Sequence, residues 1–447
     1  MMVDAFDLLV IGAGPGGLAT ARRSAAHGAR VAVIEADRPG GTCVNRGCIP
    51  EALTDFAAGF PALFADAPGY GWHLGSAHFA WNDFLAARRR EIERLDTRHA
   101  QHLKQSGVTL VQGRAAFAGP HTLAVGERRL AGEFVAIATG AVAGTLPVPG
   151  GALALADFDL YRLVQLPERL ALVGDGYIAT RAAGTLRGLG IETVLVCPGD
   201  GLLPGYDGEL VAALTASLAA RGVEIVCCAP VAGIAPDPAG IRIDCGRAAV
   251  TAGAAVVCGH WRANTAGLGL ERVGVATDAS GAIVVDAARR TSLPHVWALG
   301  DCTDRARHLT PVAVAEGRAL ADHLFGGEDW QFDDSAIPVA ISAQPEAATV
   351  GLSEEAARAH FGAEVHCHTE NFLTTYDYLA GRNQRSFVKL VTDGAAGRVL
   401  GVHMLGHNAV EIVQGLSLAV RLGATKADLD RAIGIHPSST EEFFSLG

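Results

Sequence analysis

Two cysteines five positions apart, Cys43 and Cys48, are the residues of this chain best suited to redox chemistry. They lie in the segment Gly-Gly-Thr-Cys-Val-Asn-Arg-Gly-Cys-Ile-Pro, residues 40–50, where we expect a helix to begin. A thiol near a helix N-terminus has a lowered pKa and is a better nucleophile. A dithiol beside a flavin can also take up two electrons and pass them on by thiol–disulfide exchange. The spacing therefore predicts a redox-active dithiol.

The segment before the cysteines has the pattern of a dinucleotide-binding βαβ unit, residues 6–35. Gly12, Gly14 and Gly17 form a G-x-G-x-x-G turn between an expected strand and an expected helix, and Glu35 ends the next strand. Glycines at this turn allow a pyrophosphate to approach the helix N-terminus, and the acid can accept hydrogen bonds from a ribose. This segment predicts a dinucleotide site.

A second unit of the same kind begins at Arg169, with the turn Gly174-Asp175-Gly176-Tyr177-Ile178-Ala179. Its second strand ends at Cys197, where there is neither an acid for a ribose nor an arginine for a 2′-phosphate. We therefore expect a weaker nucleotide site here than in the first unit. From Ser335 onward, short strands alternate with helices, which predicts a further α+β domain.

The composition excludes several classes of protein. The chain has 447 residues, with 36 basic and 47 acidic side chains and a net charge of -11, which argues against nucleic-acid binding. No run reaches the roughly 18 apolar residues of a membrane span. Asp4 and Asp7 stand where a cationic leader segment would lie, so we expect a cytoplasmic protein without membrane contact. Only three of the basic residues are lysines.

The remaining seven of the nine cysteines are most simply buried thiols. In His366-Cys367-His368, the two histidines of an expected strand would share one face and the cysteine would occupy the other. We therefore expect no metal site in this chain.

Segments along nearly the whole chain resemble the class I flavoprotein disulfide reductases, the pyridine nucleotide-disulfide oxidoreductases, and within them the glutathione reductases. The resemblance implies an α/β fold with two Rossmann-type dinucleotide-binding domains and a C-terminal α+β dimerisation domain. An FAD-binding and central domain would span 1–145 and 263–332, a nicotinamide-type domain 146–262, and the dimerisation domain 333–447. The matching segments are GAGPGG, GGTCVNRGCIP, ATG, GDGYIA, ALGDC, LTPVAVAEGR, TVGLSE, GATKAD and IHPSSTEE.

The resemblance also implies roles for individual residues. Cys43 would be the interchange thiol that attacks the substrate, and Cys48 would face the flavin. His436 and Glu441 of the partner subunit in a homodimer would form an acid–base pair, and an imidazole is suited to this because it titrates near neutrality. FAD would lie on Gly12, Gly14, Gly17, Glu35, Thr42, Thr139, Gly140 and Asp301.

One departure from the family pattern is a reversal of charge. The family has a lysine three residues after the second cysteine and a glutamate in the second nucleotide helix, where this chain has Glu51 and Arg181. We predict that the two form a flavin-side ion pair of opposite polarity, and the alternative is compensated neutral drift. A negative charge there would disfavour a nearby thiolate and an anionic reduced flavin.

Two further departures concern the ligands. Gly174, Gly176 and Tyr177 would hold a nicotinamide, but the missing phosphate-binding arginines leave open whether NADPH, NADH or neither reduces the flavin. Arg22 and Arg318 match the family's carboxylate-binding arginines, and His99 replaces a tyrosine that covers the substrate. We expect a small anionic thiol or disulfide as substrate.

Three functions agree with these residues. The first is an FAD-dependent thiol–disulfide oxidoreductase working in the reductase direction. The second is a dithiol oxidase that forms a disulfide without NAD(P)H and passes the electrons to dioxygen. The third is a flavin-binding protein without turnover, against which the intact set of Cys43, Cys48, His436 and Glu441 argues.

Overall fold

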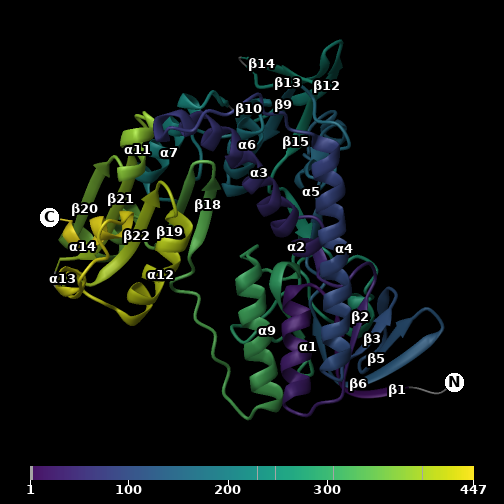
Figure 1. Ribbon diagram of the computed structural model, residues 1–447. Helices are drawn as coiled ribbons and strands as arrows, with labels where there is room; N and C mark the ends of the chain where they lie inside the picture. Colours follow the sequence, from purple (N-terminus) through teal and green to yellow (C-terminus); the bar gives the residue numbers. More distant parts are fainter. Residues whose placement is uncertain (1–3, 229, 247, 306, 395, 447) are drawn as a thin grey trace. The chain divides into compact units, whose positions relative to one another are not determined.

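The computed structural model describes residues 4–228, 230–246, 248–305, 307–394 and 396–446 (Figure 1). The chain forms two compact units, each described by itself. The first comprises Met1–Leu53, Trp81–Gly144 and His260–Asp334, and the second comprises Thr54–Ala80, Thr145–Gly259 and Ser335–Gly447. Within the described ranges, no helix is both long enough and apolar enough to cross a membrane.

The first unit is built on a seven-stranded sheet with a parallel centre. Three consecutive residues of its central strand, Leu8, Leu9 and Val10, have no exposed surface, as expected for a parallel strand that is covered on both faces. The strands are β1 (Asp4–Ile11), β2 (Val31–Glu35), β3 (Thr109–Gln112), β4 (Ala115–Gly119), β5 (Thr122–Val125), β6 (Arg128–Ile137) and β17 (Val296–Ala298), with a separate pair β7 (Ala141–Ala143) and β16 (Trp261–Ala263).

Three helices of the first unit position the candidate site residues. Figure 1 shows α1 (Pro15–Ala26) and α9 (Thr310–Phe325) side by side, with α4 (Trp81–Gln105) beside them. The helices α1 and α9 approach closely because Gly317 has no side chain, and a Cβ there would lie 2.6 Å from the Gly16 carbonyl oxygen. The shorter helical elements are α2 (Gly41–Asn45), α8 (Leu270–Val273) and η3 (Gly300–Cys302), while α3 (Cys48–Asp66) begins in the first unit and continues in the second.

The second unit contains a parallel five-stranded sheet, in the order β11-β10-β9-β15-β8, and a small antiparallel sheet. Its helices α6 and α7 bury leucines and alanines against the parallel strands. The strands are β8 (Leu155–Ala156), β9 (Arg169–Val173), β10 (Glu192–Cys197), β11 (Glu224–Cys227) and β15 (Ala254–Val257), then β12 (Gly233–Asp237), β13 (Gly240–Asp244) and β14 (Ala249–Ala252). The helical elements are η1 (Ala67–Tyr70), α5 (Asp157–Leu160), α6 (Tyr177–Gly188) and α7 (Gly208–Ala220).

The last part of the second unit is an antiparallel five-stranded sheet, in the order β18-β19-β22-β21-β20, against which α12 packs. The seven-stranded sheet of the first unit and the two five-stranded sheets of the second unit confirm the predicted α/β fold, with two Rossmann-type sheets and a C-terminal α+β part. The strands are β18 (Val339–Ala343), β19 (Glu346–Gly351), β20 (Val365–Phe372), β21 (Ser386–Asp393) and β22 (Val399–Leu405). The helices are α10 (Glu354–Phe361), α11 (Thr375–Ala380), α12 (Ala409–Leu422), α13 (Lys426–Arg431) and α14 (Glu442–Ser445).

Candidate functional site

The two cysteines of the predicted dithiol lie on two different helices. Cys43 lies in the middle of α2, and Cys48 is the first residue of α3. Their side chains hydrogen bond to each other, with Cys43 half-buried and Cys48 exposed. The geometry therefore places both sulfur atoms where they can exchange a bond.

Sequence reasoning missed a third member of this group, Thr310. Its hydroxyl lies 3.5 Å from the Cys48 Sγ and also hydrogen bonds to Cys43. Thr310 opens α9, 262 positions along the chain from Cys48, and it belongs to the LTPVAVAEGR segment. That segment was a signal for the family, but nothing in it indicated contact with the thiols.

The predicted lowering of the thiol pKa is wrong for Cys43, whose pKa is raised. The main cause is its hydrogen bond with Cys48, followed by burial. The carboxylate of Glu51 raises the pKa further, whereas Thr310 lowers it. A helix of five residues, with Cys43 at its centre, offers little of the N-terminal stabilisation that the sequence suggested. The two thiols therefore influence each other's titration, and a nearby base would help Cys43 to lose its proton.

The first dinucleotide turn has the backbone geometry that a bound pyrophosphate requires. Gly12 has a φ of +107°, and a Cβ on it would lie 2.4 Å from the Ala138 carbonyl oxygen. A Cβ on Gly17 would lie 1.9 Å from the Gly12 oxygen, so only glycine fits at either position. Gly14, in contrast, faces open space, since a Cβ there would meet only the Gly41 Cα, at 3.9 Å. Such an open backbone edge at the start of α1 is what a phosphate group needs.

Glu35 is held in place at the end of β2, beside this turn. One carboxylate oxygen accepts from the Ala13 N–H at 2.7 Å, and the other accepts from the Asp37 N–H at 2.7 Å. Each oxygen keeps a second lone pair for a ribose hydroxyl. The open edge at Gly14 and this fixed acid fit the dinucleotide FAD, which would lie along them.

The cysteine segment is attached directly to the dinucleotide turn. The Gly40 N–H donates to the Ala13 carbonyl oxygen at 2.8 Å, and Gly41, with a φ of +61°, packs on Gly14. Thr42 follows in α2, so this predicted FAD residue and Cys43 both lie beside the turn. The thiols and the dinucleotide turn thus form one site within the first unit.

The other predicted FAD residues lie on neighbouring elements of the same unit. Thr139 and Gly140 follow β6, where the Asn264 side-chain amide donates to the Thr139 carbonyl oxygen at 3.1 Å. Asp301 lies in η3, and its carboxylate is 3.6 Å from the His308 ring nitrogen. The carboxyl ends of parallel strands β6 and β17 bring these residues to one edge of the sheet.

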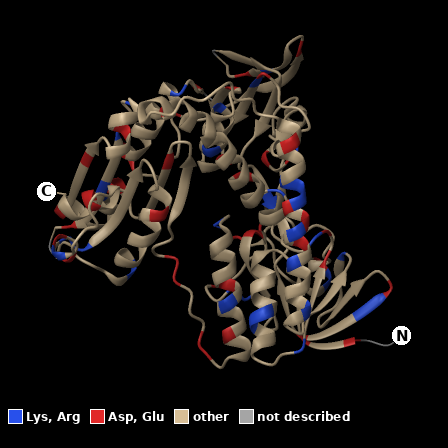
Figure 2. Cartoon of the chain, in the orientation of Figure 1, with Lys and Arg blue, Asp and Glu red and all other residues tan. Residues whose placement is uncertain are grey.

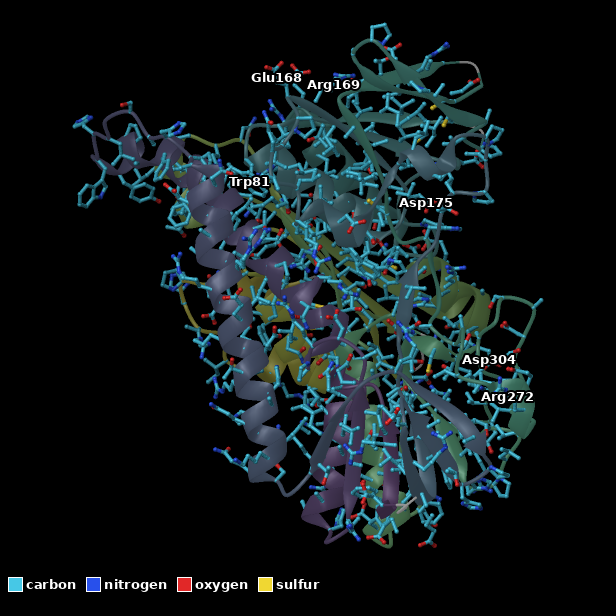
Figure 3. All side chains as sticks on the ribbon, turned by 90° about the vertical axis from the view of Figure 1, so that its right-hand side faces the viewer. Trp81, Glu168, Arg169, Asp175, Arg272 and Asp304 are labelled. Carbon is cyan, nitrogen blue, oxygen red and sulfur yellow. The ribbon has the colours of Figure 1, made fainter. Side chains whose placement is uncertain are left out.

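The second dinucleotide turn has the predicted shape, and the strand that follows α6 ends without an acid. Gly174 has a φ of +157°, Gly176 caps α6, and Tyr177 is the first residue of that helix. Asp175, labelled in Figure 3, lies between the two glycines. At the end of β10, Cys197 stands where an acid would bind a ribose.

The predicted partners Glu51 and Arg181 belong to different units, and their ion pair stays a prediction. Within the second unit, Arg181 donates two hydrogen bonds, of 2.9 and 2.6 Å, to one oxygen of Asp55. The Thr185 hydroxyl donates to the other oxygen. Asp55 lies one helical turn after Glu51 on α3, so the sequence pointed to the right helix and overlooked this acid.

The predicted acid–base residues are joined in the second unit. His436 Nδ1 lies 2.8 Å from Glu441 Oε2, and the other Glu441 oxygen accepts from the Ser438 N–H at 3.3 Å. These contacts lower the pKa of Glu441. The His436 side chain is 81% exposed, so its second nitrogen is directed to solvent or to a ligand.

Of the three predicted substrate residues, Arg22 and His99 lie near each other. His99, on α4, is half-buried, and its pKa is lowered by burial and by the positive charges of His102, Arg22 and Arg98. Figure 2 shows several Lys and Arg positions, in blue, along α4. Arg318 lies exposed on α9, the helix that packs on the Arg22 helix α1.

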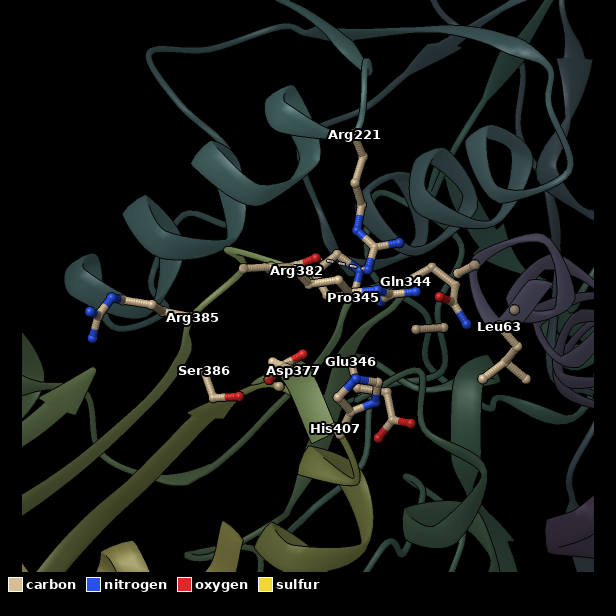
Figure 4. Close-up of a pocket in the computed structure, with 15 residues that line it drawn as sticks. Leu63, Arg221, Gln344, Pro345, Glu346, Asp377, Arg382, Arg385, Ser386 and His407 are labelled. Atoms are coloured by element: carbon tan, nitrogen blue, oxygen red, sulfur yellow. Dashed lines mark hydrogen bonds between the residues drawn. The ribbon is translucent and has the colours of Figure 1, made fainter. Parts of the chain in front are cut away.

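A separate cavity of about 170 Å³ lies in the second unit (Figure 4). Three arginines line it, of which Arg382 binds Asp66 at 2.5 Å and Arg221 binds the Gln384 side chain at 3.1 Å. No cysteine is among the described residues that line this cavity.

Comparison with known proteins gives matches over nearly the whole chain. Residues 6–317 match the pyridine nucleotide-disulphide oxidoreductase family, and residues 337–446 match the dimerisation domain of that family. A glutathione reductase of Nostoc sp. is 40% identical over 455 residues, which cover 99% of both chains. One of Burkholderia cepacia is 40% identical over 442 residues, covering 99% of this chain and 98% of the relative. A chloroplastic/mitochondrial glutathione reductase of Pisum sativum is 35% identical over 454 residues, covering 99% and 82%.

Proposed function

Because the chain belongs to the pyridine nucleotide-disulphide oxidoreductase family, we propose that it reduces a small anionic disulfide through Cys43 and Cys48. It is an FAD-dependent disulfide oxidoreductase of the glutathione reductase type. The observation that carries the proposal is the attachment of the thiol segment to the first dinucleotide turn, with Gly40 bonded to Ala13. FAD, when bound, supplies the two-electron carrier that the thiol pair requires.

In this proposal, two cysteines and a histidine carry out the steps of the exchange reaction. Cys43 attacks one sulfur of the substrate disulfide and forms a mixed disulfide, and the first substrate thiol leaves. Cys48 then attacks the Cys43 sulfur and releases the second thiol, closing the Cys43–Cys48 bond. The raised pKa of Cys43 makes a base necessary, and His436 of the partner subunit in a homodimer takes and returns that proton.

Glu441 fixes the ring of His436, so the Glu441→Gln substitution should lower kcat/KM by about 10- to 100-fold. Its carboxylate binds Nδ1 and leaves Nε2 as the nitrogen that moves the proton. The measurement is the pH profile of kcat/KM for disulfide reduction, compared with that of Glu442→Gln. An unchanged profile in Glu441→Gln would show that the ring is oriented by other groups.

Arg22 is proposed to bind a substrate carboxylate. Arg22→Gln should therefore raise KM by about 10- to 100-fold with little change in kcat, because this contact stabilises the bound substrate and the transition state equally. The control is Arg23→Gln, since the neighbouring Arg23 is bound to Asp322 at 2.6 Å. A similar KM in Arg22→Gln and Arg23→Gln would show that Arg22 does not bind the substrate. His99→Tyr in the same assay tests whether the family's tyrosine improves binding.

The direction of electron flow is tested by adding NADPH, NADH or a dithiol to the holoenzyme under anaerobic conditions and recording the flavin absorbance. We expect both nucleotides to bleach it, with less than about tenfold preference, since no arginine follows β10 to bind a 2′-phosphate. Bleaching by thiols alone, reversed by air, would instead support the dithiol oxidase that Cys197 at the ribose position suggests. A cytoplasmic location stays a prediction.

A further inference from the structure

Four of the nine cysteines lie in two adjacent pairs in the nucleotide-type part of the second unit. Cys197 ends β10 and Cys227 ends β11, and the two residues are neighbours across these parallel strands. Cys228 is the neighbour of Cys227 in the chain, and burial and then the nearby Cys228 raise the pKa of Cys245. The prediction that all these thiols are buried is wrong for Cys227, which is exposed.

We propose that Cys197 and Cys227 form a second redox-active dithiol, which low-molecular-weight disulfides oxidise independently of Cys43 and Cys48. The geometry of the parallel strands supports this pair. Residues 197 and 227 are direct partners in the β10–β11 register, and the Cys228 N–H donates to the Cys197 carbonyl oxygen at 3.0 Å. Partners in adjacent strands are spaced about 4.8 Å apart, which lies within the Cα–Cα range of disulfides.

The two thiols differ in exposure in the way that an exchange pair requires. Cys227 is exposed and is the sulfur that a small disulfide can reach. Cys197 is fully buried beneath the loop that follows β10, where its Sγ donates to the Gly201 carbonyl oxygen at 2.9 Å. Burial and the neighbouring Cys227 also raise the pKa of Cys197, so it stays protonated until the first exchange has occurred.

The chemistry balances with a disulfide as the only oxidant. The Cys227 thiolate attacks a disulfide RSSR, forming the mixed disulfide Cys227–S–S–R and releasing one thiol. Cys197 loses its proton and attacks the Cys227 sulfur, which forms the Cys197–Cys227 bond and releases the second thiol. The protein loses two hydrogens and two electrons, and RSSR gains both. The bond would form at the end of β10, at the place of the ribose-binding residue of a dinucleotide fold.

Tryptic peptides separate Cys197 and Cys245 from the pair Cys227 and Cys228, and the single alanine variants separate Cys227 from Cys228. Cleavage at arginine puts Cys197 on 188–221, both Cys227 and Cys228 on 222–242, and Cys245 on 243–247. The reduced holoenzyme is treated anaerobically with glutathione disulfide, quenched in acid, alkylated and mapped without reduction. We expect a link between 188–221 and 222–242. Cys228→Ala and the unrelated Cys367→Ala should keep this link, and Cys197→Ala should retain a glutathionyl group on Cys227.

Three results would overturn the proposal. One is the absence of the link at concentrations that oxidise Cys43 and Cys48. Another is a link within 222–242 or to 243–247 in its place, and the third is survival of the link in Cys227→Ala. The first dithiol is read in the same map from 31–46 and 47–88, so a failure there is distinguished from a failure of Cys197 and Cys227.

Discussion

Replacing Cys43 by serine is expected to lower disulfide turnover by about 10³-fold or more while leaving the cofactor bound. Serine has the same branching as cysteine with a slightly smaller side chain that can still hydrogen bond, so the dinucleotide turn should be unaffected. It cannot form a mixed disulfide, however, and the exposed Cys48 thiol has no second sulfur on which to complete the exchange. Steady-state disulfide reduction and the flavin spectrum of the purified variant test both parts of this expectation.

The matched variant is Cys48→Ser, because the two proposed roles predict different single-turnover products. Cys43 in this variant should still open one substrate disulfide and stop at the mixed disulfide, which mass spectrometry detects on peptide 31–46. Cys43→Ser should show no such adduct on peptide 47–88 at a comparable rate. If the adduct formed on Cys48 in Cys43→Ser, and not on Cys43 in Cys48→Ser, Cys48 would be the thiol that attacks the substrate. The dithiol would still be part of the mechanism.

The sequence indicated the elements around this site because their signals are local. The turn glycines and Glu35 are needed by the backbone of one βαβ unit, and the structure has β1, α1 and β2 where the pattern predicted them. In the C-terminal part, the predicted alternation of short strands and helices also occurs, with β21 and β22 among the strands. Short-range periodicity is sufficient for such assignments.

Contacts between distant segments could not be predicted in the same way. Thr310 meets Cys48 because of where α9 starts, and Arg181 meets Asp55 across 126 positions. The pKa of Cys43 also depends on such contacts, since its partner thiol, its burial and Glu51 together outweigh the helix effect that the sequence suggested. Exposure of Cys227 was missed for the same reason, because composition alone says only that cysteines are usually buried.

Lys389 is one of only three lysines in the chain, and it is the centre of a buried charged group in the second unit. Its Nζ lies 3.0 Å from Asp207 and 2.7 Å from both Glu209 and Glu354. The Lys389 and Asp207 side chains are 1% and 0% exposed. Asp207 also caps α7, while Lys389 lies on β21, so the group joins the nucleotide-type part of the unit to its C-terminal sheet.

The Lys389→Met substitution should lower the free energy of unfolding by about 3–5 kcal/mol, because it leaves the buried Asp207 carboxylate without its cation. Urea unfolding of the holoenzyme measures this, and Lys389→Arg, which keeps the charge, should lose less. The control is Lys426→Met, since Lys426 pairs with Asp430 at the surface and should contribute at most about 1 kcal/mol. Equal losses in the two methionine variants would show that the buried group does not stabilise the fold.

Acidification should remove part of the same stabilisation. The hydrogen bonds from Lys389 and then from Arg358 lower the pKa of Glu354 to about 2, from an ordinary value of 4.5. A carboxyl group whose pKa is lowered by folding stabilises the protein above its unfolded pKa, and this contribution is lost as the pH falls through the folded value. Unfolding measured between pH 4.5 and 2 should therefore depend on pH less steeply in Lys389→Met than in the wild-type protein. An identical pH dependence would mean that Arg358 alone holds Glu354 ionised.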